Sequence, residues 1–133
     1  MNMALQIKIQ SMKKGQATKW YGKAVKRQDV TLQQIAEMIS RSNSVTESDV
    51  YGVLKALVYE MKFLLQMGHT VKLEGFGNFH LTIESEMVDN QEDYRLEEHV
   101  KRVKCKFTPA SHRIHGGKLS YYFCEGVELE RKK

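Results

Sequence analysis

The chain has 133 residues, of which 41% are hydrophobic and 28% charged, with a single proline and a net charge of +5. This length fits one domain of ordinary size, and the composition excludes a disordered or low-complexity chain. The longest apolar runs are only a few residues, so the sequence predicts neither a transmembrane helix nor a signal peptide.

Residues 1–30 predict a basic β-hairpin. Alternating apolar and polar side chains from Leu5 to Ile9 have the period of a half-buried strand, and residues 20–25 form the second strand. The segment carries seven Lys or Arg residues against one acid, a net charge of +6. A basic bias of this kind favours an anionic partner, with nucleic acid ahead of membrane headgroups.

Residues 31–83, with a net charge of −1, predict two helices followed by a pair of strands. Thr31 and Gln34 have the spacing of a capping box that begins the first helix. Thr46 is the predicted N-cap of the second helix, and Gly68 is its predicted C-terminal cap. Apolar side chains cover a wide face of the second helix, so we expect burial against more than one neighbour, in this chain or in a second one.

The strand pair is predicted to turn at Gly75 and Gly77, since glycine permits a positive φ. Apolar and polar side chains alternate from Phe79 to Ile83. Residues 84–98 then carry seven acids against one arginine, a net charge of −6. We expect this segment to be a solvated acidic arm.

Residues 99–133, with a net charge of +6, predict a returning basic strand over 99–107 and a final strand over 119–124. In the returning strand the apolar residues, Cys105 among them, point to one face, and we expect Cys105 to be buried there. The opposite face carries Arg102, Lys104 and Lys106. Cys105 and Cys124 do not make a disulfide framework, which favours a reducing cytoplasm.

The order of these elements, with two motifs, resembles the bacterial histone-like HU and integration-host-factor proteins. The motifs are Gly75-Phe76-Gly77-Asn78-Phe79, after the helices and a strand, and Lys104-Cys105-Lys106-Phe107-Thr108-Pro109, in the returning segment. The resemblance covers about residues 31–114. It implies an α+β fold with a helix–helix base, a β-sheet saddle and a projecting arm, assembled as an intertwined dimer.

We therefore expect one HU-like domain over residues 1–133. Its parts are an N-terminal β extension (1–30), helices and first saddle strands (31–83), an acidic arm (84–98), and a returning strand with the C-terminal segment (99–133).

The resemblance implies two sets of site residues. The expected core of the dimer is Phe76, Phe79, Phe107, Leu57, Met61 and Leu64. The expected DNA-binding residues are Arg102, Lys104, Lys106, Lys101, Arg95, Lys72 and Arg113.

The acidic arm departs from the family pattern. Family arms are basic, and they usually carry an Arg-Asn-Pro motif whose proline wedges between base steps. Residues 84–98 contain no proline, and phosphate repels their acids. We therefore expect weak, non-specific and salt-dependent binding to duplex DNA, with little bending.

Two functions from different classes follow from this sequence. The first is a non-enzymatic, histone-like protein of the cytoplasmic nucleoid that binds double-stranded DNA as a homodimer. The alternative is an HU-fold dimer repurposed for protein–protein contact through its acidic arm, with weak or no DNA binding. Because the sequence shows no nucleophile–base pair, phosphate-binding loop, dinucleotide fingerprint or zinc-ligand spacing, we expect no enzyme activity, cofactor, metal, small-molecule substrate or membrane partner.

Overall fold

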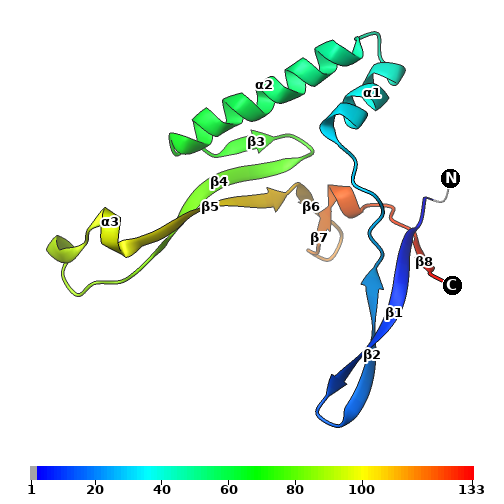
Figure 1. The fold of residues 1–133 in the computed structure, drawn as a ribbon, viewed down its shortest axis with the longest axis horizontal. Coiled ribbons are helices and arrows are strands. Elements are labelled where there is room, and N and C mark those ends of the chain that lie inside the picture. Colours follow the sequence, from blue (N-terminus) through cyan, green and yellow to red (C-terminus); the bar gives the residue numbers. More distant parts are fainter. Residues whose placement is uncertain (1–2) are drawn as a thin grey trace. The chain divides into compact units, whose positions relative to one another are not determined.

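The structure, a computed structural model, describes residues 3–133. The chain divides into two compact units, whose elements are labelled in Figure 1. The first unit joins the residues up to Val30 with Cys124–Lys133, and the second spans Thr31–Phe123. Among the described helices, none is both long and apolar enough to cross a membrane.

The first unit is a three-stranded sheet in the order β2-β1-β8. Strands β1 (Leu5–Lys14) and β2 (Ala17–Ala24) form the predicted antiparallel hairpin, and Gly15 adopts a φ of 65° in its turn. Strand β8 (Leu129–Arg131) pairs in parallel with the start of β1. The sequence did not predict β8, because three residues are too few to show a period of two.

The second unit begins with two helices at the predicted caps, α1 (Leu32–Ser42) and α2 (Glu47–Gln66). The Thr31 hydroxyl accepts the backbone N–H of Gln34 at 3.2 Å, and the Gln34 side-chain oxygen accepts the backbone N–H of Thr31 at 2.8 Å. These two bonds complete the capping box. Thr46 caps α2 by accepting a first-turn N–H at 3.3 Å.

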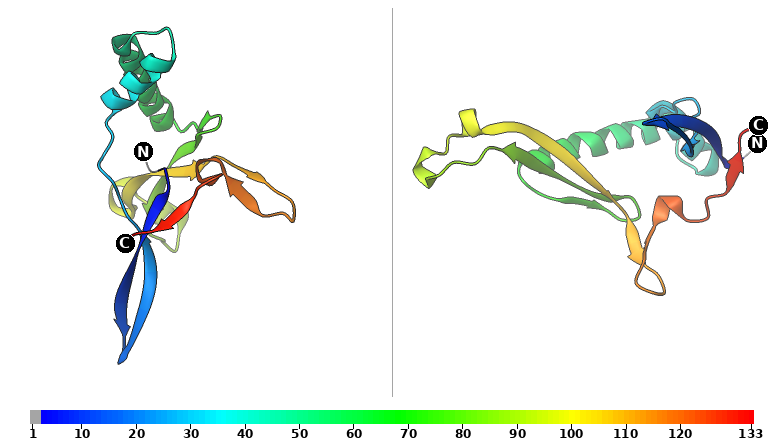
Figure 2. Two further views of the ribbon diagram at one scale, coloured as in Figure 1. Left: turned by 90° about the vertical axis from the view of Figure 1, so that its right-hand side faces the viewer. Right: turned by 90° about the horizontal axis from the view of Figure 1, so that it is seen from below.

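A three-stranded antiparallel sheet follows, with β4 (Gly77–Ser85) between β3 (Val71–Leu73) and β5 (Val100–Pro109). The register places Phe79 opposite both Val71 and Phe107. Helix α2 lies along one face of this sheet, as both views in Figure 2 show.

The acidic arm is more ordered than expected. Between β4 and β5 the chain forms two short helical turns, η1 (Gln91–Asp93) and α3 (Leu96–His99). The paired part of the arm ends where Ser85 lies opposite Val100. Neither turn has an amphipathic repeat, since each is about one helical turn long, and the sequence therefore gave no signal for them.

The final strand expected over 119–124 is shorter than predicted. Strand β7 (Leu119–Tyr121) pairs with β6 (Ser111–Arg113), and the chain then enters a 3₁₀ turn, η2 (Tyr122–Cys124). The first residue of η2 donates its backbone N–H to the carbonyl of Ala110 at 3.0 Å. This bond keeps the register of the β6–β7 ladder for one more residue, and the 3₁₀ turn then ends the strand.

We predict that Gly77→Ala destabilises the protein by roughly 2–4 kcal/mol, from left-handed backbone strain together with overpacking. Gly77 has a φ of 149°, and an added Cβ would lie 2.4 Å from the carbonyl oxygen of Thr108 and 2.6 Å from the Phe107 ring. Denaturant unfolding measures the change.

The matched control for this variant is Gly52→Ala. Gly52 lies within α2, and an added Cβ there would meet no heavy atom within 4 Å. Alanine should stabilise this helix by about 0.5–1 kcal/mol. Equal stability of the two variants would contradict the tight fit at Gly77.

Candidate nucleic-acid interface

One face of the β3–β4–β5 sheet collects four of the basic side chains singled out in the sequence. Directly opposed residues of an antiparallel pair project to the same face, and alternate residues along a strand share it. The polar residues of β4 on this face are Asn78, His80, Thr82 and Glu84, which lie opposite basic residues or Thr108. The basic residues of this face are Lys72, Arg102, Lys104 and Lys106.

Glu84 lies among these cations and pairs with two of them. Its Oε2 is 3.0 Å from Nε of Arg102 and 3.4 Å from Nζ of Lys104. All three side chains are well exposed, so water screens the attraction. Among the described residues, Lys72 and Lys106 take part in no ion pair.

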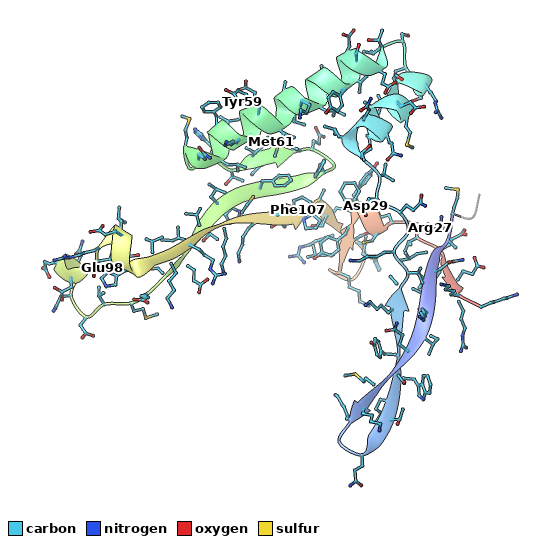
Figure 3. All side chains as sticks on the ribbon, viewed as in Figure 1. Arg27, Asp29, Tyr59, Met61, Glu98 and Phe107 are labelled. Atoms are coloured by element: carbon cyan, nitrogen blue, oxygen red, sulfur yellow. The ribbon has the colours of Figure 1, made fainter. Side chains whose placement is uncertain are left out.

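Two further predicted DNA-binding residues lie toward the arm and face its acids. The Nζ of Lys101 is 3.6 Å from a Glu86 carboxylate oxygen, and Nη1 of Arg95 is 3.9 Å from one of Glu98. Figure 3 labels Glu98 at the far end of the β4–β5 ribbon. The structure therefore does not bring this pair onto the face that holds the other four cations.

Arg113, the remaining predicted contact, belongs to the β6–β7 hairpin. Its Nη1 donates to the carbonyl oxygen of Gly117 at 2.9 Å, across the turn of that hairpin. Its guanidinium is thus held by its own loop and does not belong to the sheet face that carries Lys72 and Lys106.

The base of the arm is tied together by hydrogen bonds. The backbone N–H of Glu86 donates to the carbonyl of His99 at 2.8 Å, and the hydroxyls of Ser85 and Tyr94 lie 2.5 Å apart. The backbone N–H of Arg95 also donates to Nδ1 of His99 at 2.9 Å. These bonds hold the acidic turns close to the end of the ribbon.

The opposite face of the sheet is apolar and forms an open groove of about 620 Å³ with α1 and α2. Met61 lies on the side of α2 that faces the sheet, and Tyr59 lies on the other side (Figure 3). Four of the six predicted core residues line the groove: Leu57, Met61, Phe76 and Phe79. Leu64, also predicted for this core, is exposed and lies outside the lining.

An aromatic cluster closes one part of this face. The Phe79 and Phe107 ring centroids are 4.7 Å apart, and Phe76 is within 5.8 Å of both. Phe123 adds a fourth ring, 5.8 Å from Phe76. Sequence reasoning missed Phe123, because it placed this residue in a regular strand and nothing in that pattern shows the chain turning back.

Cys105 is exposed, which corrects the expectation that it is buried. Its strand face is the apolar one, as predicted, but that face borders the open groove. Among the described residues the buried hydrophobic side chains are Ala36, Val50, Leu65 and Val71. A single chain therefore leaves many large hydrophobic side chains in contact with water.

A metal site requires several ligating side chains close together, and residues 3–133 do not provide such a group. No group of three or more His, Cys, Asp or Glu residues in this part of the chain is placed to hold a metal ion.

The helix pair, the glycine turn and the sheet with one basic and one apolar face define an HU-like α+β protein. The sequence model described as "HU domain fused to wHTH, Ig, or Glycine-rich motif", abbreviated HU-HIG, matches residues 3–115. The chain belongs to this family.

Two individual proteins are similar to this chain, one in sequence over part of it and one in fold over nearly all of it. Integration host factor subunit alpha of Actinobacillus succinogenes is 35% identical over 52 residues, which are 39% of this chain and 53% of that subunit. A crystal structure from Bacteroides vulgatus, described as a candidate bacterial DNA-binding protein, has a TM-score of 0.60 at 8% identity. That match covers 96% of this chain and 48% of the other, so the chain spans about half the length of each relative.

We predict that Glu84→Gln changes the free energy of unfolding by less than about 1 kcal/mol, because exposed ion pairs contribute little to stability. Glutamine keeps the length of the side chain and removes the charge that faces Arg102 and Lys104. Urea denaturation would measure this, and a loss of several kcal/mol would show that the pair holds the sheet together.

Proposed function

We propose that this protein is a non-enzymatic, histone-like DNA-binding protein that contacts the backbone of duplex DNA without strong sequence specificity. The observation that supports this most is the gathering of Lys72, Arg102, Lys104 and Lys106 on one exposed sheet face. Lysine and arginine supply the counterion-releasing contacts on which such binding depends. Membership of an HU-domain family, and a relative named integration host factor, agree with this function.

The proposed contacts differ in how available they are. Lys72 and Lys106 are the most available, and Arg102 and Lys104 must exchange Glu84 for phosphate. Lys101, Arg95 and Arg113 are peripheral contacts in this proposal, since each already has an acidic or carbonyl partner. The acids and missing proline of residues 84–98 make the proposed binding weak and the bending of the duplex small.

The proposed setting follows from this function. The protein acts in the cytoplasmic nucleoid, with double-stranded DNA as its partner and without a cofactor, a small-molecule substrate or a membrane.

Replacing Arg102, Lys104 and Lys106 together by alanine tests the surface. Binding should weaken similarly on every duplex, and the slope of log Kobs against log salt should become shallower by about 2–3, near 0.9 per lost phosphate contact. A salt titration with fluorescently labelled random duplex measures both. The charge-matched control replaces Arg41, Lys55 and Lys118, and it should keep the wild-type slope. If the two triple variants behave alike, the contact surface lies elsewhere.

The Glu84→Gln variant tests the competition between carboxylate and phosphate. Removing this acid frees two cations and removes a repulsive charge, so affinity for duplex DNA should rise at low salt. The increase should fade as salt rises. Unchanged or weaker binding would show that Glu84 does not lie beside the bound phosphate.

We further propose that the functional form is a homodimer in which a second chain covers the apolar groove. The groove exposes hydrophobic side chains of α2 and part of the aromatic cluster to water. Soluble monomers rarely expose an apolar patch of this kind, because contact with water is unfavourable for it. The proposed dimer core is Leu57, Met61, Phe76, Phe79 and Phe107, with Leu64 at its margin.

Leu57→Asp should dissociate or unfold this dimer, because it places a charge in the apolar groove. Its neighbour Ala56 lies outside the groove lining, and Ala56→Asp should leave the dimer intact. Sedimentation equilibrium at micromolar concentration distinguishes the two. A wild-type protein that sediments as a folded monomer of 15.4 kDa would contradict the proposal.

The alternative, a dimer that uses its acidic arm to bind another protein, has one observation in its favour. Glu84 and Glu86 form ion pairs with Arg102, Lys104 and Lys101. These pairs reduce the positive charge that the surface offers to DNA. Absence of binding to any duplex at low salt would favour this alternative.

A further inference from the structure

The β1–β2 hairpin of the first unit is a second, separate concentration of positive charge. Its strands carry five lysines and no acidic residue: Lys8, Lys13, Lys14, Lys19 and Lys23. Within residues 3–133 none of the five takes part in an ion pair. All five are exposed, so this charge is offered to solvent without compensation from the protein.

The register concentrates four of these lysines on one face. Lys8 lies directly opposite Lys23, and Lys19 lies opposite Met12 on the same face, with Lys14 at the turn. Like charges directly opposite each other destabilise a strand pair. The hairpin therefore gains nothing from the Lys8–Lys23 pair, which an anionic ligand between the two ammonium groups would stabilise.

The rest of this lysine face is suited to a polar ligand. Tyr21 lies opposite Gln10 and donates its hydroxyl hydrogen to Oε1 of Gln10 at 3.0 Å. Met12 shares the lysine face, but the larger apolar surface lies on the other face, where Ile9 pairs with Gly22 and Trp20 with Ser11. A hairpin that docked on a lipid surface through its apolar face would direct the lysine face away from the lipid.

We propose that the lysine face of the hairpin, formed by Lys8, Lys14, Lys19 and Lys23, is a second surface for the phosphate backbone of duplex DNA. A two-stranded ribbon is one of the elements that the major groove admits. Lys8 and Lys14 are six residues apart on one strand, about 20 Å, which spans several phosphates of a DNA strand. The inference shares its ligand with the function proposed above, but it involves none of the same residues.

The test compares two full-length double variants with equal loss of charge. Lys8→Gln/Lys23→Gln removes the opposed pair and also relieves its repulsion, so the hairpin should stay folded. Lys55→Gln/Lys118→Gln removes two charges from α2 and the β6–β7 turn. The readout is the salt dependence of binding to labelled random duplex, with circular dichroism to check the fold.

We expect the hairpin variant to make the slope of log Kobs against log salt shallower by about 1.8, so that its affinity relative to the wild type falls roughly sixtyfold between 1 M and 0.1 M salt. The control should keep the wild-type slope, and Lys8→Arg/Lys23→Arg should restore it. Equal slopes for the hairpin variant and the wild type overturn the inference.

The same titration separates this inference from the function proposed above. If the Arg102/Lys104/Lys106 variant loses affinity and the hairpin variant does not, only the hairpin inference fails. If the hairpin variant alone loses affinity, the sheet surface fails and the hairpin stands. A wild-type protein that binds no duplex at low salt overturns both. Binding to phosphatidylserine vesicles that the hairpin variant loses, with an unchanged DNA slope, would assign the lysine face to a membrane and overturn the inference.

Discussion

The antiparallel pairing of β4 with β5 is the constraint on which the rest of the second unit depends. Because side chains alternate along a strand, this register sends Phe79 and Phe107 to the apolar face and His80 and Lys106 to the opposite face. A slip of one residue would exchange the two faces. The close fit of Gly77 against the carbonyl of Thr108 opposes such a slip. The same ladder therefore determines the apolar surface and the basic one.

The two faces have different requirements for a partner. Exposure of the apolar groove to water is unfavourable. Any chain that covers the groove therefore lowers the free energy of the system, and it needs no specific charge pattern to do so. The basic face is already hydrated and partly neutralised by Glu84, so its interactions depend on ionic strength. Assembly and ligand binding should therefore respond differently to salt.

The sequence predicted the structural features that depend on residues close to one another along the chain. Thr31 and Gln34 marked the start of α1, and alternation predicted that Arg102, Lys104 and Lys106 share a face, as the register has it. It did not predict that Glu84 lies opposite Arg102, because that pairing depends on how many residues the arm uses to turn.

Long-range placement was beyond the sequence patterns for the same reason. The contact of the Phe123 ring with Phe76 and the exposure of Cys105 depend on tertiary packing, which no local period records.

The parallel pairing of β8 with β1 affects the order in which the first unit folds. Leu5 pairs with Leu129, so this contact closes a loop that contains the whole second unit. The hairpin is local and forms early, whereas its third strand must overcome the entropy of a very long loop. During synthesis one edge of β1 thus stays unpaired until residues 129–131 have emerged, and a foreign strand can add there in the meantime.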